Sequence, residues 1–252
     1  SDADNDGMPD LVIAGEWMPL TILKNKNGKF SVVNIGLQAA TGWWNSITTA
    51  DIDNDGDMDY IVGNFGLNGF IRPSEQLPVR AYAKDFDNNG SFDAVFSTYL
   101  PSGINEEIKE YPIAGRDEFI KEMSIMKERF PNYASYARTE MKNIFSEQEL
   151  NGALQLTATN FSSGWIENKG SFQFVLHALP AQAQWAPVYG IVVNDFNADG
   201  YMDILLNGNE FSMAPTLGRY DALNGLLLQG DGKGNFLPLP VMQSGIYIPG
   251  NG

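Results

Sequence analysis

The chain has 252 residues, 43 % of them hydrophobic, so it is long enough and apolar enough to fold around a sizeable core. Its formal net charge of −15 argues against a nucleic-acid partner, whose phosphates need an excess of Lys and Arg, and against an anionic membrane surface. The sequence has no cysteine and no apolar run of about 18 residues, which excludes disulfides, thiolate metal sites and a transmembrane helix.

An aspartate-rich motif, D-x-[DN]-x-[DN]-G-x-x-D, occurs four times, beginning at Asp2, Asp51, Asp85 and Asp195. In a tight loop, side-chain oxygens at positions 1, 3 and 5 can converge on a hard cation such as Ca²⁺, while the glycine at position 6 permits the sharp turn. Position 7 offers its backbone carbonyl, and position 9 closes the loop. The sequence therefore predicts up to four Ca²⁺ ions, held by Asp2, Asp4, Asp6, Met8, Asp10, Asp51, Asp53, Asp55, Asp57, Asp59, Asp85, Asp87, Asn89, Ser91, Asp93, Asp195, Asn197, Asp199, Tyr201 and Asp203.

The four motifs differ from one another and from an EF-hand. Asn89 and Asn197 replace carboxylates by neutral amides, so we expect weaker binding in the third and fourth loops. An EF-hand needs Glu at position 12 and flanking helices, whereas position 12 is apolar in all four motifs: Ile13, Val62, Phe96 and Leu206. The alternative that these Asp-Gly clusters are ordinary solvated turns stays open.

Short strand-like runs flank each motif and fill most of the remaining chain. They lie at 11–15, 45–50, 60–64, 79–84, 94–99, 189–194 and 204–208. Three segments have the pattern of hairpins: 20–34 around Asn27–Gly28, 163–180 around Lys169–Gly170, and 225–240. Modules of about four strands are typical of propeller blades. We therefore expect an all-β fold, a β-propeller or partial propeller of about four blades, in which the first blade lacks an opening strand before Ser1.

The unit strand–DxDxDGxxD–strand resembles the FG-GAP or VCBS repeat of integrin α-subunit propellers and bacterial surface proteins. The segments "DIDNDGDMDYIVGNFG" and "DFNADGYMDILLNGNE" carry this resemblance, and "GRYDALNGLLLQGDGKGNF" is similar to ASPIC/UnbV-associated bacterial surface proteins. The resemblance implies a β-propeller over residues 1–252, Ca²⁺ in the loops and an exported protein, and it implies no particular reaction. The chain starts and stops within blades, so we expect it to be a fragment of a longer protein.

A helical insertion interrupts the strand pattern at residues 116–150. Residues 116–130 place Phe119, Met123, Met126 and Phe130 on one helical face, and Pro131 should end that helix. A second helix is expected at 133–145, with Tyr133, Ala137, Met141 and Ile144 aligned, followed by a capping box at 146–149. We expect a helical hairpin packed on the propeller, with a lid or docking surface as the alternative.

No catalytic residue is assigned. The single histidine, His177, lies in a strand-like run, and without cysteine a catalytic triad or a zinc site has little support. Paired carboxylates for glycoside hydrolysis stay an open alternative, because the chain has 31 acidic residues.

Aromatic and loop residues suggest a weaker ligand-binding hypothesis. Trp43 and Trp44 could stack on sugar rings, although packing between blades is the alternative. The polar run 209–225 offers Arg219, Tyr220 and Asp221 as contacts. The sequence thus favours a non-enzymatic, calcium-stabilised module at the cell surface, outside the cell or in the periplasm. Its ligand would be a protein or a glycan; a polysaccharide lyase or hydrolase, or a purely structural segment, are the alternatives.

Overall fold

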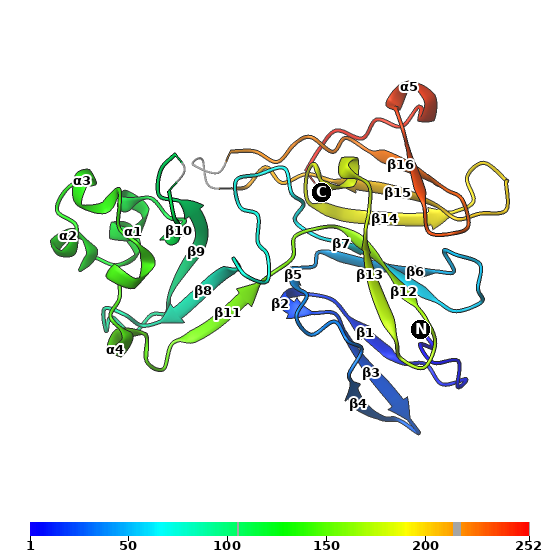
Figure 1. Cartoon of the computed structure of the whole chain (residues 1–252), viewed down its shortest axis with the longest axis horizontal. Helices are drawn as coiled ribbons and strands as arrows, with labels where there is room; N and C mark the ends of the chain where they lie inside the picture. The colour runs from blue at the N-terminus through cyan, green and yellow to red at the C-terminus, as the bar shows by residue number, and fades with distance from the viewer. Residues whose placement is uncertain (105, 214–217, 252) are drawn as a thin grey trace. The chain divides into compact units, whose positions relative to one another are not determined.

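The computed structural model describes residues 1–104, 106–213 and 218–251, and its chain divides into two compact units. Unit 1 comprises Ser1–Phe70 and Asn160–Gly252, and unit 2 comprises Ile71–Thr159. Within the described residues the strands form five antiparallel sheets and the helices are short (Figure 1). The predicted all-β, propeller-like fold is confirmed.

Unit 1 contains four of these sheets. In the first sheet the order is β1 (Leu11–Ile13), β3 (Thr21–Lys26) and β4 (Lys29–Val33), and β2 (Glu16–Pro19) pairs separately with β5 (Thr41–Trp43). A second sheet has the order β13 (Phe174–Ala178), β12 (Gly164–Asn168), β7 (Asp59–Gly63) and β6 (Ser46–Ala50). A third has the order β14 (Val188–Asn194), β15 (Asp203–Gly208), β16 (Leu226–Gly230) and β17 (Phe236–Leu239). The short helices η2 (Ala181–Gln184) and α5 (Val241–Ser244) complete the unit.

The second sheet is assembled from two distant parts of the chain. Strands β6 and β7 precede unit 2, whereas β12 and β13 follow it, and β12 pairs with β7 through Gly164 opposite Val62 (Figure 1). Unit 2 is therefore inserted between the second and third strands of one four-stranded sheet. The hairpin predicted at 163–180 completes the sheet that carries the second aspartate loop.

The residues at the ends of the four aspartate loops are paired in the same register. The residue before the motif faces position 9 in three sheets: Ala50 opposite Asp59, Lys84 opposite Asp93, and Asn194 opposite Asp203. In the first loop the Asp10 N–H donates to the Ser1 carbonyl at 2.6 Å, which repeats that pairing before β1. One loop geometry is thus built four times on the ends of antiparallel strands.

The apolar residues predicted to form strands supply the core of unit 1. Ile22 of β3, Tyr60 and Val62 of β7, and Ile166 of β12 are each at most 2 % exposed and pack in one cluster. The predicted Asn27–Gly28 turn is also present, with φ of 54° and 82°, the left-handed pair that a two-residue hairpin requires.

Unit 2 contains one sheet and a group of short helices. The sheet has the order β10 (Ile108–Pro112), β9 (Asp93–Pro101), β8 (Val79–Lys84) and β11 (Leu154–Ala158), and it carries the third aspartate loop between β8 and β9. The helices are α1 (Arg116–Glu122), α2 (Met126–Arg129), α3 (Tyr133–Tyr136), η1 (Met141–Asn143) and α4 (Glu147–Leu150).

The two long helices predicted at 116–130 and 133–145 are each broken. The first stops at Glu122 because Met123 adopts an extended conformation, which lets its fully buried side chain enter the core. Phe119, Met126 and Phe130 are buried in the same cluster, so the predicted apolar face is confirmed although the continuous helix is wrong. In the second segment Met141 and Ile144 are buried as predicted, whereas Tyr133, predicted on the same face, is 65 % exposed. Tertiary packing here overrides the helical periodicity.

The predicted capping box at 146–149 is present and yields a pH-dependent prediction. Ser146 donates to Glu149 Oε2 from its backbone N–H at 2.7 Å and from its hydroxyl at 2.8 Å, and Arg129 Nη2 lies 2.7 Å from Glu149 Oε1. These donors lower the pKa of Glu149 from 4.5 to about 2. Because the folded-state pKa is lowered, the stability that this carboxylate contributes is present above pH 4.5 and is lost as the pH falls through about 2.

We expect Glu149→Gln to reduce the free energy of unfolding by about 1 kcal/mol or less at pH 7, since the side chain is partly exposed and solvent screens the ion pair. The wild type and the variant should become equally stable near pH 2. Urea unfolding at both pH values measures this, with the exposed Glu147→Gln as control. An equal loss at both pH values would contradict the prediction.

Candidate functional site

All four aspartate loops fold through the same carboxylate–backbone contacts. In the second loop Asp51 accepts the N–H of Asp55 at 3.2 Å and that of Gly56 at 3.1 Å. The same two contacts are made by the first residue of each other motif: Asp2, Asp85 and Asp195. Each position-6 glycine has a φ between 84° and 93°, a conformation that disfavours any other residue: Gly7, Gly56, Gly90 and Gly200. The motif therefore specifies its own tight turn.

Three of the loops bring carboxylate oxygens together. Oxygens from three aspartates lie within 4.8 Å of one another in each of the groups Asp2–Asp4–Asp6, Asp51–Asp53–Asp59 and Asp85–Asp87–Asp93. Among the residues that the structure describes, the fourth loop forms no such group of three; Asn197 stands at its third position and donates to Asp199 Oδ2 at 2.8 Å. The substitution of an amide for a carboxylate accounts for this difference.

Unpaired oxygens show that a divalent cation fits the first two loops. Oδ1 of Asp4 and Oδ1 of Asp53, both at position 3, are buried and have no hydrogen-bond donor. A buried acceptor without a partner costs free energy, and a carboxylate surrounded by other carboxylates costs more. Oxygen ligands in flexible geometry are those that Ca²⁺ prefers, so the donor set matches this ion.

The aspartates at position 9 also hold neighbouring strands. Asp59 is fully buried; its Oδ2 accepts the N–H of Ile52 at 2.9 Å, and its Oδ1 accepts the N–H of Asn168 in β12 at 2.8 Å. Asp10 and Asp203 likewise accept one N–H from their own loop and one from the next strand. Each carboxylate oxygen retains a lone pair for a cation.

Burial raises the pKa of Asp59 to about 6, even though two backbone donors oppose the shift. Burial and the neighbouring Asp55 carboxylate raise the pKa of Asp53 as well. Ionising several carboxylates in this loop therefore costs free energy, and a bound cation would reduce that cost.

Two side chains from neighbouring strands contact the first and second loops. Lys24 of β3 forms an ion pair with Asp4 and a second, at 2.9 Å, with Asp6 Oδ2. Glu167 of β12 is buried, and after burial and Asp55 its carboxyl group is a further cause of the raised pKa of Asp53. Sequence reasoning missed both, because neither residue belongs to the motif.

His177 has contacts that explain its presence. Its Nε2 lies 2.9 Å from Glu167 Oε2, and its ring stacks on Trp165 with centroids 4.8 Å apart. These contacts hold the imidazole between Glu167 and Trp165.

Both tryptophans of the proposed sugar platform pack inside unit 1, Trp43 against other aromatic rings. Trp44 is 4 % exposed, and its indole N–H donates to the Met18 carbonyl at 3.0 Å. The ring of Trp43 lies 5.0 Å from that of Phe65 and 4.5 Å from that of Phe161. These contacts favour packing over sugar binding for both residues.

The loop predicted at 209–225 as a binding segment contains both buried and exposed residues. Its residues 214–217 lie outside the described residues. Tyr220 is buried against Phe65, with ring centroids 4.8 Å apart. Arg219 and Asp221 are both more than half exposed, and Arg219 lies over the ring of Phe211. Of the three predicted contacts, only Arg219 and Asp221 are available to a ligand.

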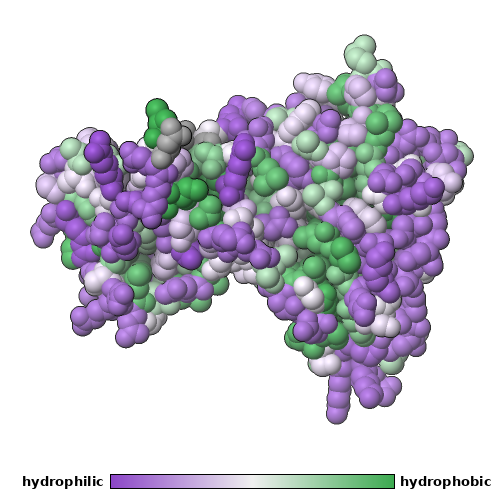
Figure 2. Space-filling model, in the orientation of Figure 1, coloured by the Kyte–Doolittle hydropathy of each residue, from purple (hydrophilic) through white to green (hydrophobic). Residues whose placement is uncertain are grey.

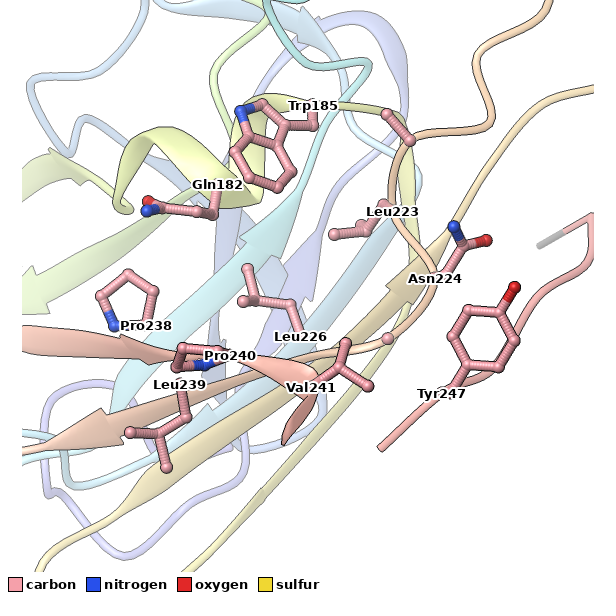
Figure 3. A pocket seen from close by; sticks show the side chains of 12 residues that line it. Gln182, Trp185, Leu223, Asn224, Leu226, Pro238, Leu239, Pro240, Val241 and Tyr247 are labelled. Carbon is pink, nitrogen blue, oxygen red and sulfur yellow. The ribbon is translucent and has the colours of Figure 1, made fainter. Parts of the chain in front are cut away.

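Unit 1 has a pocket of about 310 Å³ that sequence reasoning did not find. In Figure 3 the Trp185 indole lies opposite Pro240 and Val241, with Gln182 towards one end and Asn224 and Tyr247 towards the other. Trp185 is 45 % exposed. Among the residues that the structure describes, no charged side chain lines the pocket, which is formed by Gln182, Trp185, Ala222, Leu223, Asn224, Gly225, Leu226, Pro238, Leu239, Pro240, Val241 and Tyr247. The sequence feature that could have indicated this pocket is Trp185 together with the prolines that follow β16, Pro238 and Pro240.

Comparison with protein-family models matches residues 2–62 to the FG-GAP-like repeat. The match covers the first loop, the first sheet and the second loop, so the predicted repeat is confirmed over these residues. The similarity to ASPIC/UnbV-associated proteins stays a prediction. No curated protein and no solved structure matched the chain. Among the described residues, no helix is long and apolar enough to cross a membrane.

Proposed function

Because residues 2–62 form an FG-GAP-like repeat, we propose that the chain is a calcium-stabilised binding module of an exported or cell-surface protein. The observation that carries the calcium proposal is the pair of buried, unpaired carboxylate oxygens, Oδ1 of Asp4 and Oδ1 of Asp53, inside groups of three aspartates. The cation would be held by the side chains at positions 1, 3, 5 and 9 and by the carbonyl at position 7. When bound, it supplies positive charge among carboxylates that would otherwise repel one another.

The location follows from the expected affinity. EF-hand calcium loops in extracellular modules bind Ca²⁺ with dissociation constants of about 10⁻⁴ to 10⁻³ M, and we expect a similar range here. Such sites fill only where free Ca²⁺ is in the millimolar range, which favours the cell surface, the extracellular space or the periplasm over the cytosol. Four ions would add eight positive charges to a formal net charge of −15 and so reduce its self-repulsion.

The pocket at Trp185 is the site that we assign to the ligand, a protein or a glycan. Its lining is apolar with two exposed aromatic rings, Trp185 and Tyr247, and two amides, Gln182 and Asn224. Aromatic faces combined with neutral hydrogen-bonding groups suit an uncharged group, such as a sugar ring or an apolar peptide side chain. Figure 2 shows hydrophobic surface at α5 beside this pocket, where Val241 and Met242 are exposed.

A glycan array probed with the Ca²⁺-loaded chain tests this assignment, together with an assay for unsaturated uronide products. We expect binding without product, and Trp185→Ala should weaken that binding at least about tenfold. The control is Tyr133→Ala, which removes an exposed aromatic ring in unit 2. Formation of unsaturated product would establish a lyase instead, and binding that survives Trp185→Ala would place the ligand elsewhere. Binding to no glycan would leave a protein as the ligand.

A further inference from the structure

The first and second loops have the same acid at positions 1, 3, 5 and 9, yet neighbouring strands place opposite charges against them. At the first loop the ammonium group of Lys24 contacts both Asp4 and Asp6, which are the ligands at positions 3 and 5. Its side chain is 29 % exposed, and the ammonium also lies 5.1 Å from the centroid of the Phe172 ring. A cation entering this loop must share these two carboxylates with Lys24 or displace it.

At the second loop β12 contributes a further carboxylate. The side chain of Glu167 is 11 % exposed; it precedes Asn168, whose N–H donates to Asp59, and it interacts with Asp53, whose Oδ1 has no hydrogen-bond donor. The position of Glu167 is fixed by its chain neighbour, since the Asn168 N–H donates to Asp59 and the Asn168 amide donates to the carbonyls of Ala3 and Met58. Lys169 Nζ contacts Glu167 Oε1, and His177 Nε2 lies 2.9 Å from Glu167 Oε2.

We propose that these two side chains set the order of Ca²⁺ affinities, Lys24 by weakening the first site and Glu167 by strengthening the second. The inference rests on the proposed function, because it presupposes Ca²⁺ in both loops. A positive charge in contact with two ligands repels the incoming cation, whereas a buried carboxylate beside the ligand set attracts it. The number of charged ligands is a main determinant of affinity in calcium loops.

A Ca²⁺ titration monitored by ¹⁵N NMR measures Ca²⁺ binding at each loop separately. The N–H groups of Gly7, Gly56, Gly90 and Gly200 each donate to the first carboxylate of their own loop, so each reports on one site. With Lys24→Met we expect the Ca²⁺ concentration at the midpoint of the Gly7 amide shift to fall about tenfold. With Glu167→Gln we expect the midpoint for Gly56 to rise about tenfold. The midpoints for Gly90 and Gly200 should not move in either variant.

Two exposed residues of unit 1 provide matched controls: Lys26→Met on the same strand as Lys24, and Glu16→Gln. Neither should shift any midpoint. If Glu167→Gln does not fold, Lys169→Met serves in its place; it frees the Glu167 carboxylate of its ion pair and should lower the Gly56 midpoint. General destabilisation cannot produce shifts of opposite sign confined to one glycine each.

An unchanged Gly7 midpoint in Lys24→Met, or an unchanged Gly56 midpoint in Glu167→Gln, would overturn the inference while leaving Ca²⁺ binding intact. If no glycine amide of the wild type responded to Ca²⁺, the calcium proposal itself would fail, and the inference with it.

Discussion

Removal of Ca²⁺ should lower the melting temperature of the chain by about 10 °C or more. A site filled at ten times its dissociation constant stabilises the folded state by about 1.4 kcal/mol, from the logarithm of its occupancy. Each kcal/mol shifts the melting temperature of a chain of this size by about 2–4 °C. Several filled loops together therefore give a large effect. Thermal unfolding in about 10 mM Ca²⁺, which is about ten times the upper dissociation constant of about 10⁻³ M, and in excess chelator measures it.

The control for this prediction is a cation that the loops should not prefer. Mg²⁺ demands octahedral geometry and gives up its water reluctantly, so the same concentration of Mg²⁺ should restore little of the lost stability. Equal melting temperatures with Ca²⁺ and with chelator would show that the loops are ordinary turns, the alternative that the sequence left open.

Substitution Asp59→Ala should reduce the free energy of unfolding by about 3 kcal/mol or more, because it leaves two buried N–H groups, of Ile52 and Asn168, without an acceptor. It also removes a proposed ligand, so the loss should be larger in Ca²⁺ than in chelator. Denaturant unfolding in both conditions measures the two contributions separately.

The matched control is Asp57→Ala in the same loop. Position 7 offers a backbone carbonyl to the cation, and the Asp57 side chain accepts an exposed hydrogen bond from Asn5. We expect this variant to lose less than about 0.5 kcal/mol and to keep its response to Ca²⁺. Similar losses for Asp57→Ala and Asp59→Ala would mean that the buried carboxylate does not hold β12 to the loop.

The elements nearest the aspartate motifs could be predicted because their residues determine local geometry. Glycine at position 6 and aspartate at position 1 are enough to close each turn, and the apolar runs after them form β1, β7, β9 and β15. The Asn27–Gly28 hairpin is equally local. In each case the signal and the structure that it specifies lie within about ten residues, the range over which turn chemistry and strand periodicity act.

What could not be predicted depends on contacts between distant segments. The pairing of β12 with β7 crosses an insertion of a whole compact unit, and no periodicity reports such a partner. For the same reason Lys24 and Glu167 were missed as neighbours of the aspartate loops. The helix predicted at 116–130 ends where the Met123 side chain enters the core, and Trp44 is buried although the small polar residues Asn45 and Ser46 follow it. Local sequence indicates what a segment can form, and packing decides which possibility is realised.

Metal ions among the aspartates are the central claim, and a crystal structure grown in Ca²⁺ with anomalous diffraction data tests it most directly. We expect anomalous peaks in the first and second loops, each surrounded by the carboxylates of positions 1, 3, 5 and 9 and the carbonyl of position 7. Difference density with only the scattering of water between Asp51, Asp53 and Asp59, at Ca²⁺ concentrations well above the millimolar range, would contradict the claim.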